Sequence, residues 1–109
     1  MRAHRLKTWP AAFRAIRDGW KTCELRKADR DFQVGDYLLL IEFDPKEDQA
    51  CGDYIYRRVT HIVQPGDPPN GLVEGFVILS IEECSRVEKD ALQGNVGFLP
   101  DVIEWLDLR

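Results

Sequence analysis

Residues 37–43 constrain the fold of this chain more than any other stretch. They are almost continuously apolar, and such a run predicts a strand that is buried on both sides or that closes a small barrel. Residues 54–63 form a second strand candidate, rich in β-branched and aromatic side chains, and residues 75–82 form a third. The segment 64–74 contains five prolines and glycines in close succession and must be a loop. The sequence therefore predicts a domain built on a sheet.

One helix is expected near the N-terminus. A short strand over residues 4–8 is followed by Pro10, which fits the first turn of a helix. The apolar side chains that share the i, i+4, i+7, i+11 spacing of one helical face are Trp9, Phe13, Ile16 and Trp20. We expect them to face the core. Gly19 is well placed just beyond the helix end, where a left-handed conformation costs little. The prediction is a helix over residues 10–18.

The remaining segments complete the expected architecture. Residues 21–26 alternate as a strand does, residues 27–33 form a loop or a single helical turn, and residues 44–53 form a polar loop. Phe32 and Val34 are expected to anchor the backbone of the loop over residues 27–33 by packing beneath it. Residues 100–108 resemble a short amphipathic helix. The predicted fold class is α+β: a small mixed β-barrel with a helix after the first strand and a short C-terminal helical extension.

Composition limits the class of protein. The 109 residues, 44% hydrophobic and 31% charged, are typical of one ordinary soluble domain spanning residues 1–109. The longest apolar run, residues 37–41, is far shorter than the roughly 20 residues that cross a bilayer, so we expect no membrane partner. No apolar segment follows the charged residues 1–5, which argues against a signal peptide and for a cytoplasmic protein.

No metal or cofactor site is expected. The chain has three cysteines, Cys23, Cys51 and Cys84, without a Cys-x-x-Cys pair, and two histidines, His4 and His61, without the spacing of metal ligands. His61 lies within a predicted strand, where a structural histidine is more common than a catalytic one. His4 has the better chance of reaching a cleft, because it precedes the helix close to Lys7.

Charge is distributed unevenly along the chain. Residues 1–30 contain nine Lys or Arg against three Asp or Glu, whereas residues 31–109 contain six against sixteen. A basic N-terminal third on an acidic body could face an anionic ligand such as nucleic acid or a nucleotide. Equally well, the basic N-terminal third and the acidic body could simply attract each other across the fold.

The segment 19–36 gathers charges of both signs between apolar anchors. Its charged candidates for a site are Lys21, Glu24, Arg26, Asp29 and Arg30. In a purely structural role, the carboxylates pair with neighbouring cations and hold the loop. In a binding role, the cations hold phosphate or a base edge while Glu24 accepts from an amino group. In a catalytic role, Glu24 orients or deprotonates a water and Lys21 stabilises an oxyanion.

The same segment resembles a known family. Gly19-x-Lys21-x-x-Glu24-x-Arg26 matches the G-x-K-x-x-E-x-R signature of ASCH domains, which belong to the PUA-like superfamily of small RNA-associated β-barrels. Residues 4–7, 24–36 and 71–81 extend the likeness to an uncharacterised bacterial and phage-associated branch of that superfamily. The likeness covers about residues 4–82 and leaves residues 83–109 as an extension without a match.

The resemblance implies a PUA-like barrel whose cleft is lined by the signature and binds RNA or a modified nucleoside. Some ASCH relatives are amidohydrolases that act on N4-acetylcytidine through a lysine, a threonine nucleophile and a glutamate. Lys21 matches that lysine, but Glu24 occupies the position of the threonine, and Thr22 lies one position out of phase. We therefore place binding of RNA or a nucleotide-like ligand ahead of hydrolysis of a modified nucleoside or RNA, with Lys21 and Glu24 as the catalytic candidates.

Several further residues are candidates for ligand contacts. The full expected binding set is His4, Lys7, Trp20, Lys21, Glu24, Arg26, Asp29 and Arg30. Trp20 borders the signature, although both it and Trp9 fit the core face of the helix. A different class of function, a protein-interaction module, would use the acidic body or the C-terminal extension. A homodimer formed through that extension is a related alternative, because Trp105 and Leu108 could be exposed there.

Overall fold

The computed structural model describes residues 2–66, 68–94 and 104–106. Its elements in chain order are β1 (Arg2–Thr8), α1 (Pro10–Arg17), β2 (Cys23–Lys27), β3 (Tyr37–Asp44), β4 (Gln49–Val63), β5 (Phe76–Glu83), α2 (Arg86–Leu92) and β6 (Glu104–Leu106). The α+β class and the helix after the first strand are as the sequence predicts, whereas α2 lies at residues 86–92, where no helix is predicted. No helix in the described part of the chain is long and apolar enough to cross a membrane.

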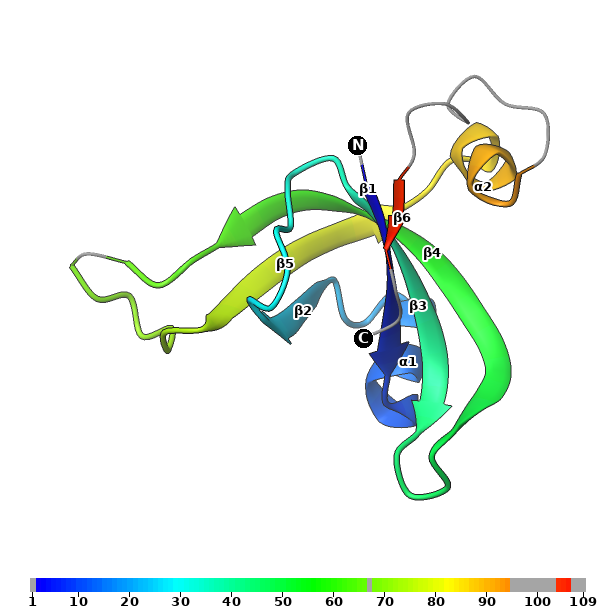
Figure 1. Cartoon of the computed structure of the whole chain (residues 1–109), viewed down its shortest axis with the longest axis horizontal. Coiled ribbons are helices and arrows are strands. Elements are labelled where there is room, and N and C mark those ends of the chain that lie inside the picture. The colour runs from blue at the N-terminus through cyan, green and yellow to red at the C-terminus, as the bar shows by residue number, and fades with distance from the viewer. Residues whose placement is uncertain (1, 67, 95–103, 107–109) are drawn as a thin grey trace.

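The six strands form one mixed sheet in the order β2-β5-β4-β3-β1-β6. β1 runs parallel to β3 and to β6, while the other neighbours are antiparallel. The sheet curls strongly, and the long strand β4 bends along its length (Figure 1). Register shifts lie between Val59 and His61 on β4 and between Ile41 and Phe43 on β3, and such bulges increase local bend and twist. The result is a curled, barrel-like sheet.

The main core fills the inside of this curl. It is made by side chains from the helix, the loop before β3 and all the larger strands: Leu6, Ile16, Phe32, Leu38, Leu40, Val59, Val77, Leu79 and Ile81. The inward positions on β3 and β5 are two residues apart, as expected for strands with one face on a core. The expectation that Phe32 anchors its loop is confirmed, because only 6% of it is exposed.

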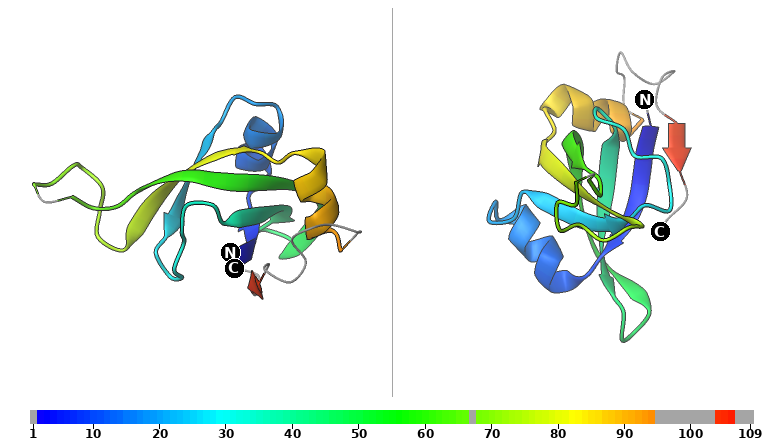
Figure 2. Two further views of the ribbon diagram at one scale, coloured as in Figure 1. Left: turned by 90° about the horizontal axis from the view of Figure 1, so that it is seen from above. Right: turned by 90° about the vertical axis from the view of Figure 1, so that its left-hand side faces the viewer.

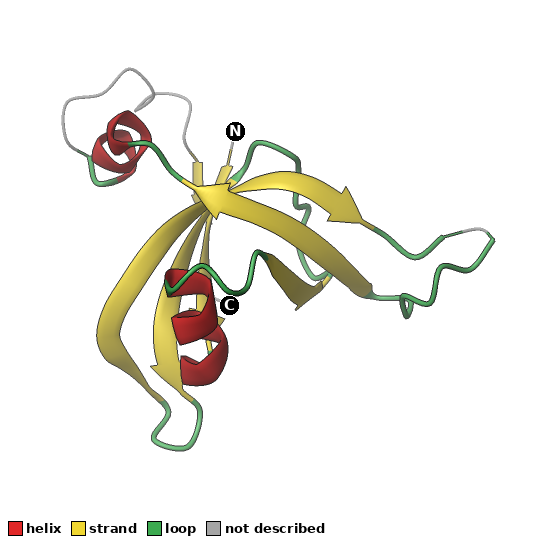
Figure 3. Ribbon diagram, turned by 180° about the vertical axis from the view of Figure 1, so that it is seen from behind, coloured by secondary structure: helices red, strands yellow, loops and turns green. Residues whose placement is uncertain are grey.

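Helix α1 follows β1 and packs against β3 (Figure 3). Pro10 occupies its first turn, Phe13 and Ile16 are buried, and Gly19 has the left-handed φ of 84° that ends it. Arg57 of β4, which is buried, donates from its Nη2 to the Ile16 carbonyl at 3.2 Å. A cation therefore lies at the C-terminal end of the helix, where the helix dipole favours it.

Helix α2 covers the opposite end of the sheet from α1 (Figure 2). The Ser85 hydroxyl accepts from the Glu88 backbone N–H at 3.1 Å, and Glu88 accepts in return from the Ser85 N–H at 2.9 Å, which completes a capping box. The Tyr37 hydroxyl donates to the other oxygen of Glu88 at 2.6 Å. A second apolar cluster lies beneath this helix and includes Ala3, Tyr37, Tyr56, Cys84 and Leu92.

Several expectations about individual segments are wrong. The polar loop predicted over residues 44–53 is shorter, because β4 begins at Gln49 and pairs with the end of β3. Val34 does not anchor its loop, since 58% of it is exposed. Residues 104–106 form a strand beside β1 and not part of a helix. The rest of the helix predicted over residues 100–108 lies outside the described residues, and the homodimer through the extension stays a prediction.

Candidate functional site

Strand β2 directs Glu24 and Arg26 toward the interior, whereas its other three side chains are exposed. Glu24 is only 5% exposed, whereas Leu25 is 60% exposed and Cys23 is also exposed. Arg26 shares the inward face with Glu24 because side chains two residues apart in a strand point the same way. The sequence predicts that the two share a face, and the structure shows that this face is the inner one.

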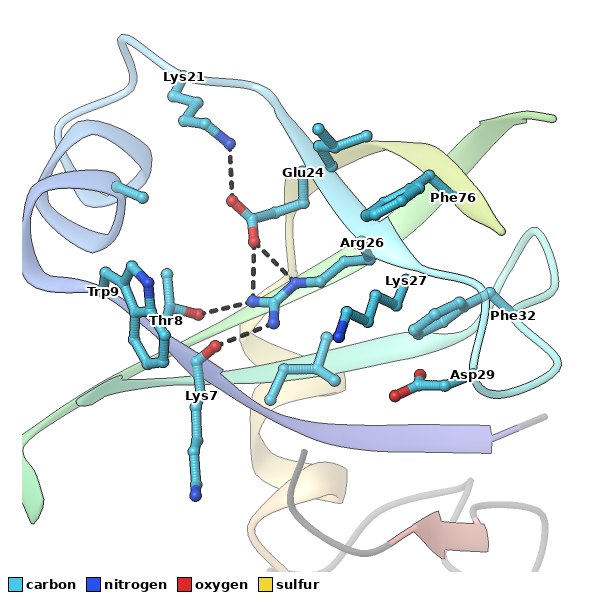
Figure 4. Close-up of a pocket in the computed structure, with 13 residues that line it drawn as sticks. Lys7, Thr8, Trp9, Lys21, Glu24, Arg26, Lys27, Asp29, Phe32 and Phe76 are labelled. Atoms are coloured by element: carbon cyan, nitrogen blue, oxygen red, sulfur yellow. Dashed lines mark hydrogen bonds and ion pairs between the residues drawn. The ribbon is translucent and has the colours of Figure 1, made fainter. Parts of the chain in front are cut away.

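The Glu24 carboxylate is held between two cations (Figure 4). One of its oxygens lies 2.6 Å from the Lys21 Nζ, and the other lies 3.0 Å from Nε and 2.8 Å from Nη2 of Arg26. The Lys21 ammonium also donates to the Cys23 carbonyl. A buried carboxylate is tolerated only when it is paired and hydrogen-bonded. Here each oxygen has its own cation.

Arg26 also joins β2 to β1 across the open side of the sheet. Its Nη1 donates to the Lys7 carbonyl at 2.9 Å, and its Nη2 donates to the Thr8 hydroxyl at 3.0 Å. Three strands separate β1 from β2 in the sheet, and the two share no backbone ladder in the described residues. We call this place the seam: residues 6–8 of β1 facing residues 24–26 of β2. One guanidinium crosses it (Figure 4).

A pocket of about 550 Å³ lies at the seam. The residues that line it are Leu6, Lys7, Thr8, Trp9, Ala12, Lys21, Glu24, Leu25, Arg26, Lys27, Asp29, Phe32 and Phe76. Three aromatic rings, three lysines, one arginine and two carboxylates thus surround one cavity. Ligand pockets commonly combine such apolar walls with a few convergent polar groups.

The structure brings four of the predicted site residues to the pocket by their side chains: Lys21, Glu24, Arg26 and Asp29 (Figure 4). Lys7 takes part differently from the expectation. Its carbonyl accepts from Arg26, but its ammonium lies 4.5 Å from the centre of the Phe43 ring. Trp20 does not belong to the lining of this pocket.

His4 and Arg30 lie behind one wall of the pocket. His4 is completely buried, its Nε2 is 2.8 Å from Asp36 Oδ2, and its Nδ1 is 3.3 Å from the Arg30 Nη1. Burial lowers the pKa of the His4 imidazole from its ordinary value of 6.5, against the opposing effect of Asp36. Its ring also contacts the Phe32 ring, with 4.7 Å between centroids. His4 therefore supports the wall and has no solvent-exposed surface.

The expectation that Trp9 and Trp20 face the core is wrong for both. Trp20 is 88% exposed, and Trp9 is 53% exposed and lines the pocket. The helical spacing extends beyond the helix at both ends, because α1 contains only residues 10–17. At positions just outside a helix, the 3.6-residue period no longer decides where a side chain points.

Sequence reasoning missed eight of the lining residues, including Thr8, Trp9, Lys27 and Phe76. Trp9, Thr8, Lys27 and Phe76 come from three separate segments that meet only because the sheet curls. A signal existed for one of them, since Lys27 follows Arg26 directly. Thr8 and Phe76 have no local pattern that marks them. The described residues contain no group of three or more side chains suited to hold a metal ion.

The arrangement can bind a flat ligand that has an anionic group. Aromatic rings can stack on a planar heterocycle, and the ammonium groups of Lys21 and Lys27 can approach phosphate or carboxylate oxygens.

A family model described as "Domain of unknown function (DUF3850)" matches residues 3–81. None of the curated proteins compared matches the chain.

Proposed function

Since the chain belongs to the family of domains of unknown function DUF3850, we propose its function from the pocket itself: it binds RNA or a nucleotide-like ligand at the seam. The observation that supports this most is a buried carboxylate, Glu24, placed between two cations on the wall of a cavity that also contains three aromatic rings. Likeness to the ASCH domains of the PUA-like superfamily points the same way.

The polar groups suggest how such a ligand would be held. Lys21 is one-third exposed and Lys27 is exposed, so both ammonium groups can reach phosphate oxygens. Glu24 keeps lone pairs beyond those used by its two cations and can accept from an amino group of a base. The rings of Trp9 and Phe76 offer stacking surfaces, which bind bases with little sequence preference.

The test is the affinity for labelled single-stranded RNA decamers, measured by fluorescence anisotropy at roughly 50 mM and 200 mM salt. We expect Lys21→Ala and Lys27→Ala each to weaken binding and to reduce the salt slope by about 0.7. Lys46→Ala is the matched control, because Lys46 is exposed in the turn between β3 and β4, away from the pocket. No affinity in the wild type, or equal losses in the control, would remove the proposal.

A second candidate, hydrolysis of an acylated nucleoside, is favoured by the 2.6 Å contact between Lys21 and Glu24. A water that gives a proton to Glu24 would attack the acyl carbon while Lys21 stabilises the oxyanion. The bond from the acyl carbon to N4 of the cytidine would then break as N4 takes that proton and leaves as the amine. Both oxygens of Glu24 are already engaged by cations, and no threonine occupies its position, so we rank binding first.

Turnover of N4-acetylcytidine and related acylated cytidines, followed by chromatography, separates these two candidates. Hydrolysis that disappears in both Lys21→Ala and Glu24→Gln supports the enzyme. Hydrolysis that survives both changes excludes these residues from the mechanism, and no turnover on the panel favours binding.

A further inference from the structure

We propose that His4 is a positioning residue that controls one wall of the pocket according to pH. As a neutral imidazole it holds Arg30 and the loop of residues 28–35, and when protonated it releases them. The effect on ligand affinity rests on the binding function proposed above, whereas the effect on the loop does not.

The hydrogen bonds of His4 define its protonation state. A guanidinium nitrogen can only donate, so the His4 Nδ1, 3.3 Å from the Arg30 Nη1, must accept. In a neutral imidazole the remaining proton is then on Nε2, which donates to Asp36 Oδ2 at 2.8 Å. Both ring nitrogens thus have partners that match one tautomer. An imidazolium would place a second N–H against the guanidinium and would lose the acceptor.

Charged groups of both signs face this imidazole. In the described part of the chain these are Asp36 at the start of β3, Arg30 in the loop and Arg2 on β1. Asp36 favours the protonated ring, while burial and the two arginines oppose it. Arg2 is partly neutralised by Asp31 at 3.7 Å. The Asp36 carboxylate is already shared, because it also accepts from the Gln33 N–H at 2.9 Å.

The loop connects this buried group to the pocket. Asp29 and Phe32 belong to the pocket lining, and the Phe32 ring is in contact with the His4 ring. One end of the loop is fixed by the Ala28 N–H, which donates to the Gly75 carbonyl at 2.8 Å. The other end is fixed by Gly35, whose N–H donates to the Val59 carbonyl at 2.8 Å. Between these ends, the loop is held by its contacts with His4 and Asp36, by the Arg2–Asp31 pair at 3.7 Å and by the burial of Phe32 in the main core.

Protonation therefore acts on the middle of the loop and not on its ends. A charged His4 repels Arg30, which lies two residues before Phe32. The loop then loses its contact behind the pocket while β2 and β3 keep their ladders. Since Phe32 supplies one of the aromatic walls, a stacked ligand loses part of its site.

The first experiment uses ligand-free protein. The side-chain NMR signals of His4 and His61 are followed between about pH 5 and 8, with the backbone amides of residues 29–33. His61 is exposed, and its signal is recorded alongside that of His4. We expect His4 to titrate below the ordinary histidine pKa of 6.5 and the loop amides to follow the His4 midpoint. A His4 that does not titrate in this range, or loop amides that ignore it, would overturn the proposal.

Two variants keep the test decisive if one of them folds poorly. His4→Gln should abolish the titration of the loop amides. Arg30→Ala should raise the midpoint of His4, because one opposing cation is removed, whereas Arg14→Ala on the exposed side of α1 should leave it unchanged. An unchanged midpoint in Arg30→Ala contradicts the role of Arg30.

The second experiment measures binding of oligouridylate decamers across the same pH range, because neither uracil nor a phosphodiester titrates there. We expect affinity to fall with the His4 midpoint in the wild type and to be independent of pH in His4→Gln. Affinity that is independent of pH despite a titrating loop overturns the link to binding. A titrating loop with no RNA affinity at any pH overturns the proposed function and leaves the loop mechanism standing.

Discussion

Arg26 makes contacts that no shorter side chain could replace. It pairs with the Glu24 carboxylate and donates to a carbonyl and a hydroxyl of β1. Arg26→Ala would leave Glu24 with a single cation and two polar groups of β1 without their donor. We expect a loss of about 3 kcal/mol in the free energy of unfolding, measured by urea denaturation.

The matched control for that measurement is Arg14→Ala. Arg14 is 56% exposed, and its ion pair with Glu42 is long, at 3.8 Å. Its removal should therefore reduce the free energy of unfolding by about 0.5 kcal/mol or less. Equal losses in the two variants would mean that the seam contributes nothing particular to stability.

The two tryptophans beside α1 should differ in ligand binding. Trp9 lines the pocket and Trp20 does not, so Trp9→Ala should weaken RNA binding about tenfold through the lost stacking surface. Trp20→Ala should leave the affinity within about twofold. Anisotropy titrations of the two variants with the same RNA decide this, and the reverse order would restore Trp20 as the contact predicted from sequence.

His4 should make stability depend on pH. Its pKa in the folded protein is lowered by burial, so the unfolded chain binds the proton more tightly. Its contribution is therefore fully present above the unfolded pKa of about 6.5 and is lost as the pH falls toward the lower folded pKa. Urea denaturation of the wild type should show this decline, and His4→Gln should show a smaller one.

At the scale of elements, the sequence predicts most strands and α1 well because their patterns are local. The apolar run of β3 and the alternation of β2 need no tertiary information. The orientation of β2, however, depends on tertiary contacts, because an amphipathic pattern alone would bury Leu25 and expose Glu24. The edge position of β2 and the two cations beside Glu24 reverse that preference. The signature predicts three of the lining residues, Lys21, Glu24 and Arg26, while Thr8 and Phe76 depend on the curl of the sheet.

Helix α2 has only seven residues and depends on its ends. Ser85→Ala removes the hydroxyl that accepts from the Glu88 N–H and should cost about 1 kcal/mol. Hydrogen exchange of the α2 amides should become faster in this variant. Ser85→Asp keeps an acceptor at the same position and should preserve protection, and equal exchange in both variants would contradict a role for the cap.

For the whole molecule, one core joins the curled sheet to α1 and to the loop before β3. Leu40 is fully buried in that core, and Leu40→Ala should reduce the free energy of unfolding by about 3 kcal/mol. Far-ultraviolet circular dichroism and tryptophan fluorescence should still give coincident transitions. Two separated transitions would show that the ends of the sheet unfold independently.

The seam also determines how wide the pocket is between β1 and β2. A backbone ladder keeps neighbouring strands about 4.8 Å apart along its whole length, which leaves no passage between them. β1 and β2 are instead connected through one side chain, so their separation depends on the reach of an arginine. The width of the pocket at the seam therefore depends on the length of the side chain at position 26. A substitution there can change this width without altering any strand pairing.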